Sequence, residues 1–305
     1  MTTEKIFDEA LKNILSEDEI LKDEPMKHHT TFRVGGPAEY YLRPKKEQVA
    51  EVLRLCLTYQ KEYLIIGNGS NLLVSDKGIS GVVIEIGKQM DEITVDGTTI
   101  YAQAGAMLSK TAHAALEAGL TGMEFAAGIP GCVGGAVVMN AGAYGGEMKD
   151  ILKSVTVLTA DGQEKELTPG ELDMSYRHSS ITEEHYMVLG VTIALEAGSQ
   201  EQIRAKMEEL KEKRVEKQPL EYPSAGSTFK RPEGYFAGKL IMDAGLRGFQ
   251  VGGVAVSEKH CGFVINKEKA TASDVYRLIQ EVQQEVYRQF GVKLETEVKM
   301  VGDFR

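Results

Sequence analysis

The sequence is poor in cysteine, in basic residues and in long apolar runs, and each shortage excludes a class of protein. Only Cys56, Cys132 and Cys261 occur among 305 residues, and they lie far apart. An odd and sparse set without CxxC or Cys/His spacing argues against disulfides and zinc, and it fits a reducing compartment. We therefore expect three buried or inert thiols and no metal site.

Basic residues are outnumbered by acidic ones, 35 against 45, which gives a net charge of −10. Nucleic-acid binding needs clustered Lys and Arg, so we expect no nucleic-acid partner, although a few local cations can still hold a small anion. The longest uncharged stretch, residues 125–146, contains seven glycines and a proline and predicts packed loops rather than a membrane-spanning helix. The N-terminal sequence MTTEKIFDEALKN is acidic and amphipathic, and it predicts no signal peptide.

Helical and strand-like apolar spacings are interleaved along the chain, a pattern typical of an α+β fold. The dipeptides Asp96-Gly97 and Asp161-Gly162 predict two β-hairpins. A charged helix opened by Ser199, with Gln202 as a capping-box partner, predicts a domain boundary near residue 200. Helices are predicted within 5–22 (one or two) and at 47–61, 107–118, 199–216, about 235–245 and 272–290, and strands at 63–66, 81–86, 187–195, within 251–266 and at 293–302.

Glycine is abundant, and it is concentrated in two uncharged loops. The first loop, residues 67–71 (GNGSN), follows the apolar run YLII, but it is neither GxGxxG nor a Walker loop. The second contains seven glycines within residues 128–146. Glycine lets the main chain approach a ligand and lets successive N–H groups bind an anion, so the pair favours a phosphate-bearing dinucleotide held without a cation. A tight turn and close helix–strand packing remain the alternatives.

Three further sets of residues could carry chemistry. Arg177 lies in the loop YRHS, although a lone arginine is more often a surface residue. Ser227 and Lys230 match the SxxK pattern literally, but Pro232 is incompatible with the helix that this motif requires, so Ser227 is expected to be a loop hydroxyl. Glu297 lies two residues from Glu295 on the last predicted strand, where a solvated face is the commoner role.

Seven motifs occur together in one order and carry a family resemblance: TFRVGGPA, GNGSNLLV, AGIPGCVGGAVVMNAGAYGGE, YRHS, PSAGSTFKRP, AGLRGFQVGGVAVSEKHCGFVIN and LETEV. From about residue 28 to about residue 302 the sequence resembles the UDP-N-acetylenolpyruvoylglucosamine reductase (MurB) family. The resemblance implies a two-subdomain FAD-binding region of the vanillyl-alcohol-oxidase (PCMH) type at 28–198, split near 90. It also implies an α+β substrate-binding domain at 199–305, after an N-terminal helical extension at 1–27.

The resemblance also implies roles for single residues. Ser227 would donate a proton, Arg177 and Glu297 would be its catalytic companions, and Lys217 and, less specifically, Lys230 would bind substrate. Arg231 stands where some members have Asn, so a side-chain amide contact is not expected there. The implied FAD-binding residues come from the two glycine loops: Gly67, Asn68, Gly69, Ser70, Asn71, Gly128, Ile129, Pro130, Gly131, Gly134, Gly135, Asn140, Ala141 and Gly142.

The implied activity is that of a cytoplasmic bacterial flavoenzyme of peptidoglycan precursor synthesis. NADPH would reduce FAD, and reduced FAD would reduce the enolpyruvyl ether of a UDP-sugar to UDP-N-acetylmuramate. Only eleven residues separate Arg177 from Leu189, which is typical of a shorter branch without an inserted tyrosine loop. A flavin oxidase of the same fold and a non-catalytic nucleotide-binding module remain the alternatives, and protein partners stay unknown.

Overall fold

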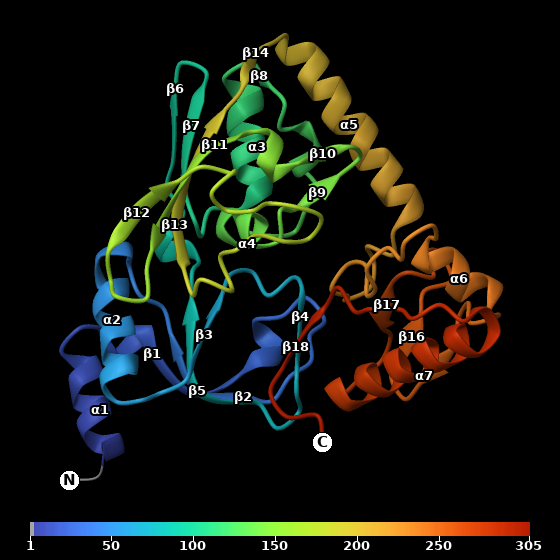
Figure 1. Cartoon of the computed structure of the whole chain (residues 1–305), viewed down its shortest axis with the longest axis horizontal. Helices are drawn as coiled ribbons and strands as arrows, with labels where there is room; N and C mark the ends of the chain where they lie inside the picture. Colours follow the sequence, from blue (N-terminus) through green and yellow to red (C-terminus); the bar gives the residue numbers. More distant parts are fainter. Residues whose placement is uncertain (1–2) are drawn as a thin grey trace. The chain divides into compact units, whose positions relative to one another are not determined.

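The computed structural model describes residues 3–305, which form two compact units, each with its own apolar core (Figure 1). The first unit comprises the chain up to Lys22, Tyr40–Asn68 and Gly81–Lys213. The second comprises Asp23–Glu39, Gly69–Ser80 and Arg214–Arg305. The division expected at residue 199 concerns ligand-binding regions and stays a prediction. The compact units differ from this division, because Asp23–Glu39 and Gly69–Ser80 belong to the same unit as the C-terminal part of the chain.

A four-stranded sheet, most of which belongs to the first unit, has the order β1-β2-β5-β3. β3 and β5 are parallel, and β5 contains the predicted strand GVVIEI except its last residue, Ile86. The helices α1 and α2 contact each other beside this sheet. The elements are β1 (Ile20–Pro25), β2 (Pro37–Leu42), β3 (Tyr63–Ile66), β5 (Ile79–Glu85), α1 (Thr3–Lys12) and α2 (Lys46–Thr58).

The N-terminal segment is part of the first core rather than an appended extension. The Phe7 ring packs edge-on against Tyr40 at 5.3 Å, and both side chains are buried. The prediction of helix as far as residue 22 was wrong for its last part, because α1 ends at Lys12 and β1 begins at Ile20. Ser16 donates its N–H to Glu19 Oε2 at 2.9 Å and starts a separate 3₁₀ turn, which stops the helix from continuing.

A five-stranded antiparallel sheet with the order β12-β11-β13-β7-β6 forms the rest of the first unit. Both predicted hairpins are confirmed, and Gly97 and Gly162 adopt the positive φ angles, +57° and +83°, that their turns require. The strands are β6 (Ile93–Asp96), β7 (Thr99–Gln103), β11 (Leu152–Leu158), β12 (Glu164–Leu167) and β13 (Met187–Ala194). Shorter pairs join β8 (Leu120–Thr121) to β14 (Glu196–Ala197) and β9 (Gly142–Ala143) to β10 (Gly146–Glu147).

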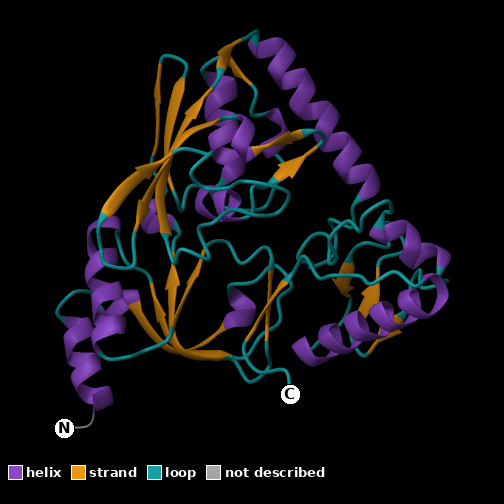
Figure 2. Ribbon diagram, in the orientation of Figure 1, coloured by secondary structure: helices purple, strands orange, loops and turns teal. Residues whose placement is uncertain are grey.

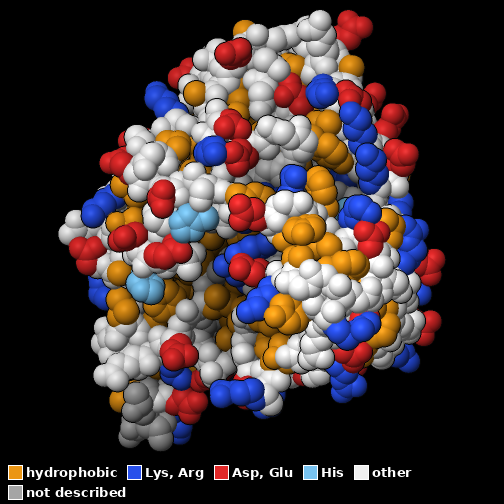
Figure 3. Space-filling model, turned by 45° about the vertical axis from the view of Figure 1, so that its right-hand side comes forward, with side chains coloured by type: hydrophobic (Ala, Val, Ile, Leu, Met, Phe, Trp, Pro, Cys, Tyr) orange, Lys and Arg blue, Asp and Glu red, His pale blue; other side chains and the backbone are white. Residues whose placement is uncertain are grey.

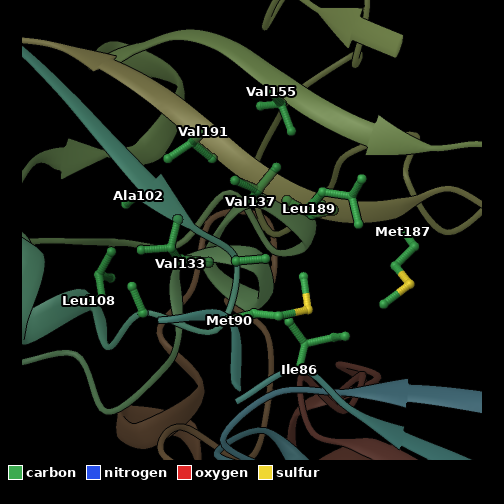
Figure 4. Packing of buried hydrophobic residues seen from close by; sticks show 14 of the residues in the cluster. Ile86, Met90, Ala102, Leu108, Val133, Val137, Val155, Met187, Leu189 and Val191 are labelled. Atoms are coloured by element: carbon green, nitrogen blue, oxygen red, sulfur yellow. The ribbon is translucent and has the colours of Figure 1, made fainter. Parts of the chain in front are cut away.

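Two helices pack on one face of this sheet, α3 (Leu108–Glu117) and α4 (Val133–Val138). Figure 4 shows Val133 and Val137 of α4 beside Leu189 and Val191 of β13. All four side chains are at most 4% exposed, so α4 is fixed by the core although it has only six residues. Helix α5 (Gln200–Lys217) follows as predicted, and the Gln202 N–H lies 3.5 Å from Ser199 Oγ.

The second unit contains short strands joined by long loops (Figure 2). β18 runs parallel to β4, and β15, β16 and β17 form a small antiparallel sheet. The last predicted strand, 293–302, was too long. Only 299–301 is a strand, because residues 295–297 bond to an irregular loop instead. The elements are β4 (Leu72–Val74), β15 (Gln250–Val251), β16 (Val254–Val256), β17 (Val264–Asn266), β18 (Lys299–Val301), α6 (Ala237–Asp243) and α7 (Ala272–Phe290).

Asp76 anchors the segment 69–80 to the second unit. Its carboxylate accepts the N–H groups of Ala272 and Ser273, both at 2.8 Å, and the Ser273 hydroxyl at 2.6 Å. These donors lie in the first turn of α7, where a negative charge is also favoured by the helix dipole.

We therefore predict that Asp76→Ala lowers the free energy of unfolding of the second unit by about 1–3 kcal/mol. Urea unfolding measures the change. The control is Asp243→Ala, which removes an exposed i,i+4 pair with Lys239 (2.7 Å) and should cost no more than about 0.5 kcal/mol. Equal losses in the two variants would contradict the anchoring role.

His260 is a partly buried histidine of the second unit whose ring is held by its neighbours. Its Nδ1 accepts the Gly262 N–H at 3.1 Å, and its ring packs edge-on against Phe263 at 5.0 Å. Burial lowers the pKa of this imidazole below its ordinary value of 6.5. The unfolded chain therefore binds more protons than the folded chain in the window below pH 6.5, and stability is lost as the pH falls through it.

We predict that His260→Asn, which keeps an acceptor for Gly262, reduces this loss of stability between pH 7 and pH 5. Urea midpoints across that range measure the slope. His28→Asn is the control, because it makes the same replacement at an exposed histidine of the same unit. A wild-type slope in His260→Asn would refute the assignment.

Candidate functional site

The two glycine loops meet inside the first unit. A Cβ on Gly67 would lie 2.1 Å from Cys132 Sγ, so only glycine permits this approach. The neighbouring Asn68 donates its side-chain amide to the Pro130 carbonyl at 2.7 Å. Residues more than sixty positions apart in the sequence are therefore in contact, and a cradle shared by the two loops stays a prediction.

The second loop leads directly into α4, and its glycines have different functions. Gly134 packs against β7's end, where a Cβ would lie 2.9 Å from the Ala104 Cβ, so close packing explains this residue. Gly135 is exposed, and the nearest atom to its Cβ would be Cys132 Sγ at an ordinary 3.6 Å. Close packing, one of the earlier alternatives, therefore accounts for Gly134, whereas a cofactor cradle at Gly135 stays a prediction. Gly128 and Pro130 are exposed and Gly131 and Ile129 half-buried, and Ile129 donates its N–H to the Ala126 carbonyl at 3.1 Å.

The remainder of the first loop belongs to the second unit, because the division falls between Asn68 and Gly69. Gly69 has a φ of +59°, and a Cβ there would lie 1.9 Å from the His29 carbonyl oxygen. Asn71 donates its side-chain amide to the Glu297 carbonyl at 3.1 Å, and its own carbonyl accepts the Lys299 N–H at 3.0 Å. One end of the predicted cofactor loop is therefore bonded to the segment of a predicted catalytic glutamate.

Ser227 and Glu297 lie on neighbouring segments of the second unit. Thr228, the residue after Ser227, joins the two segments and is fully buried. Its carbonyl accepts the Glu297 N–H at 2.9 Å, and its hydroxyl accepts the Val264 N–H at 3.1 Å. Ser227 itself forms an antiparallel bridge with Phe263 and is half-buried, less open than the exposed loop hydroxyl expected from the sequence. The segment is extended, so the SxxK interpretation is rejected by the backbone as well.

Arg177 lies in the first unit, at the third position of a tight turn in which Ser175 and His178 exchange backbone hydrogen bonds. Its φ is +55°, a left-handed conformation that is uncommon for a residue with a Cβ. The guanidinium lies 5.1 Å from the Tyr176 ring centroid and donates to the Gly142 carbonyl at 3.4 Å. The prediction of a loop is confirmed.

Asn140 is predicted to bind FAD, but its side chain is committed to the protein. The amide nitrogen donates to Glu147 Oε2 at 2.8 Å and to the Ser175 carbonyl at 3.0 Å, and the amide oxygen accepts the Lys149 N–H at 2.9 Å. Ala141 donates its N–H to Ala136, and Gly142 lies in β9. A cofactor contact at residues 140–142 would therefore come from the main chain.

The two predicted substrate lysines both lie in the second unit. Lys217 is the last residue of α5 and is exposed. Lys230 pairs with Glu295 at 3.2 Å, and both side chains are largely exposed, so Glu295 has the surface role expected of a strand glutamate.

Sequence reasoning missed the residues that hold these groups in place, namely Cys132, Thr228 and Ser179, whose hydroxyl donates to the Val138 carbonyl. All three cysteines are free and buried, as predicted, yet Cys132 is also the contact between the loops. Its place inside the glycine block was the available signal. For Thr228 and Ser179 no local pattern distinguishes them from ordinary polar loop residues.

The described residues bear on the nucleic-acid, membrane and metal-binding classes considered from the sequence. Basic and acidic side chains are interspersed on the visible face (Figure 3). Within residues 3–305, no helix combines the length and apolar character needed to cross a membrane. The same residues contain no cluster of three or more His, Cys, Asp or Glu arranged to hold a metal ion.

Two family models match the chain. Residues 38–168 match an FAD binding domain, and residues 218–301 match the UDP-N-acetylenolpyruvoylglucosamine reductase C-terminal domain. A reductase of that name from Agathobacter rectalis is 59% identical over 297 residues, covering 93% of this chain and 95% of the relative. One from Clostridium perfringens is 53% identical and covers 97% of both chains.

Solved structures agree with these matches. The crystal structure of UDP-N-acetylenolpyruvylglucosamine reductase (MurB) from Thermus caldophilus has a TM-score of 0.81 and 36% identity, covering 91% of this chain and 97% of that one. A 4-ethylphenol oxidase from Gulosibacter chungangensis, 16% identical with a TM-score of 0.50, shares the fold over 64% of this chain and 43% of its own. The expected fold class, an FAD-binding region of the vanillyl-alcohol-oxidase type followed by a C-terminal α+β region, is confirmed. Sequence, family models and structure together place the chain in the UDP-N-acetylenolpyruvoylglucosamine reductase family.

Proposed function

We propose that the protein uses NADPH and bound FAD to reduce the enolpyruvyl ether of UDP-N-acetylglucosamine enolpyruvate to UDP-N-acetylmuramate. The observation that carries the proposal is the fixed juxtaposition of the Ser227 and Glu297 segments through Thr228, in the region that matches the reductase C-terminal model. An ordinary FAD-binding module needs no such pair. The substrate is a small molecule, and a cytoplasmic location fits the pathway proposed.

The glycine loops fit FAD. Within residues 3–305, the backbone N–H groups of Asn68, Gly69 and Ser70 donate no hydrogen bond to another backbone group. Three consecutive donors of this kind suit a diphosphate, and neither loop contains a competing carboxylate. The open side of Gly135 leaves the first turn of α4 accessible to the same ligand. Gly67, Gly131 and the N–H groups around them would hold the diphosphate.

FAD, when bound, supplies the two-electron chemistry, taking a hydride from NADPH and giving it to the terminal carbon of the enol ether. The protein must stabilise what this leaves behind, negative charge on the adjacent carbon and its carboxylate. Arg177 can meet that charge with a fixed, permanently charged donor. Its left-handed backbone and short turn favour a defined position over a flexible one.

Ser227 donates the proton that completes the reduction. Serine is a weak acid, but an enolate carbon is a strong base, so a well-aligned hydroxyl suffices. The bridge to Phe263 and the buried Thr228 next to it restrict the Ser227 backbone. The serine then recovers a proton from solvent. Glu297 shares a proton with the enolate or orients Arg177, and Lys217 and Lys230 bind the substrate.

The proposal is tested by the visible spectrum of the purified protein under anaerobic conditions. Flavin absorbance should bleach with NADPH and return when the enolpyruvyl sugar nucleotide is added. Return only on admission of oxygen would instead indicate an oxidase of this fold. A protein that stays colourless when given FAD would overturn the flavoenzyme assignment.

For the proton donor, we predict that Ser227→Ala slows flavin reoxidation by the sugar nucleotide by about 10²–10⁴-fold and leaves reduction by NADPH unchanged. Stopped-flow absorbance separates the two half-reactions. Ser224→Ala, in the same loop, is the control and should behave like the wild type. Near wild-type reoxidation in Ser227→Ala would exclude this serine as the donor.

For the cradle, we predict that Gly67→Ala lowers the flavin content of the purified protein, because its Cβ would displace Cys132 Sγ. The ratio of visible to ultraviolet absorbance measures this. The double variant Gly67→Ala/Cys132→Ala removes the sulfur and should recover much of the flavin. Flavin content that stays low in the double variant, with an unchanged melting temperature, would show that the contact with Cys132 is not the reason.

A further inference from the structure

We propose that Asn140 is a positioning residue that sets the location of Arg177, and that its side chain does not bind FAD. This inference rests on the proposed function, because it assigns a task to Arg177 in the reaction. It concerns the first unit alone, to which all of its residues belong.

The turn that carries Arg177 is fixed on both sides. Before it, the Ser175 carbonyl accepts the Asn140 amide at 3.0 Å. After it, the buried Ser179 donates its hydroxyl to the Val138 carbonyl at 2.9 Å. Val138 and Asn140 flank the end of α4, so both anchors attach the turn to the same short stretch of chain.

Asn140 is suited to this task by chemistry and by conformation. It is fully buried, with a φ of +39°, a region that asparagine tolerates better than most residues. Its amide uses two donors and one acceptor, on Glu147, Ser175 and the N–H of Lys149. An aspartate would lose both donors and would place a second carboxylate against Glu147. Only an amide therefore satisfies the three partners at once.

Strain at Arg177 shows why such anchors are needed. A left-handed backbone is unfavourable for a residue with a side chain, and it persists only where its surroundings impose it. The third position of a tight turn with positive φ is normally occupied by Gly or Asn. The bonds to Ser175 and Ser179 supply that constraint, and the Arg177 contact with Gly142 adds to it.

Helix α4 links this turn to the cofactor loop. It begins after Cys132, which contacts Gly67, and ends at Val138, which holds Ser179. Six helical residues span about 9 Å, and the Val133 and Val137 side chains lock the helix onto the sheet (Figure 4). Asn140 and α4 thus hold Arg177 at a set distance from the loop proposed to bind FAD.

The test replaces one atom of the amide, in Asn140→Asp. We expect at least a 10-fold slower reoxidation of reduced flavin by the sugar nucleotide. Reduction by NADPH should stay within about 2-fold of wild type, as should the FAD dissociation constant measured by flavin fluorescence. The control is Gln48→Glu, which removes another amide donor in the same unit, to the Ile14 carbonyl at 2.8 Å, and should leave all three quantities unchanged.

A double-mutant cycle decides whether Asn140 acts through Arg177. In an Arg177→Lys background, the further change Asn140→Asp should slow reoxidation by less than about 3-fold. A full 10-fold loss in that background would refute the inference. So would an FAD affinity lowered at least 10-fold with reoxidation unchanged, which would instead support a direct cofactor contact by Asn140.

Two outcomes separate this inference from the proposed function. If the wild-type flavin is not reoxidised by the sugar nucleotide, the proposed function fails. If it is, and Asn140→Asp leaves reoxidation unchanged, only the positioning role fails. Should Asn140→Asp not fold, Ser179→Ala removes the second anchor, and it is expected to slow reoxidation at least 3-fold without changing FAD affinity. An unchanged rate there would equally overturn the proposal.

Discussion

The approach of Gly67 to Cys132 is the contact on which the arrangement of the first unit depends. The Cys132 sulfur occupies the space that a Cβ on Gly67 would need, so the two glycine loops can approach each other only because residue 67 is glycine. The Asn68 bond to Pro130 sets their relative positions. From this point α4 carries the chain to the Arg177 turn, and its two buried valines make that connection rigid. The loop proposed to bind FAD and the turn of Arg177 are therefore connected through one short helix of the same unit.

Ordering glycine on folding costs more chain entropy than ordering other residues, and the glycines of these loops have two different environments. Gly67 and Gly134 permit packing of protein against protein, whereas Gly135 leaves an open face. A count of glycines cannot separate these uses, because both depend on what lies opposite each Cα. This is why the sequence could predict a cradle only as a segment and could not say which of its glycines pack against protein and which are open.

Local signals predicted local structure well. The Asp-Gly hairpins, α7 and the YLII strand follow from turn chemistry and apolar periodicity, and they are found where expected. Failures arose where distant contacts override local preference. The first helix ends at Lys12 and does not reach residue 22, because Ser16 starts a separate turn. Residues 295–297 bond to the Ser227 loop rather than to a strand. The proposed catalytic residues Arg177, Ser227 and Glu297 were predicted through family motifs. The supporting residues Thr228 and Cys132 could not be predicted, because their roles depend on partners far away in the sequence.

Strain distinguishes residues that fill space from residues that must point somewhere. A surface arginine in a flexible loop would relax out of the left-handed region, because nothing would oppose the change. Arg177 is kept there by bonds to the residues on either side of it, and one of them comes from a buried asparagine that is itself left-handed. The left-handed conformations of Asn140 and Arg177 are both unfavourable, and the packing of the core does not require either of them. We expect such conformations where the position of the Arg177 guanidinium matters more than the stability lost in fixing it. The proposed role of Arg177, which is to stabilise a developing enolate, has this requirement.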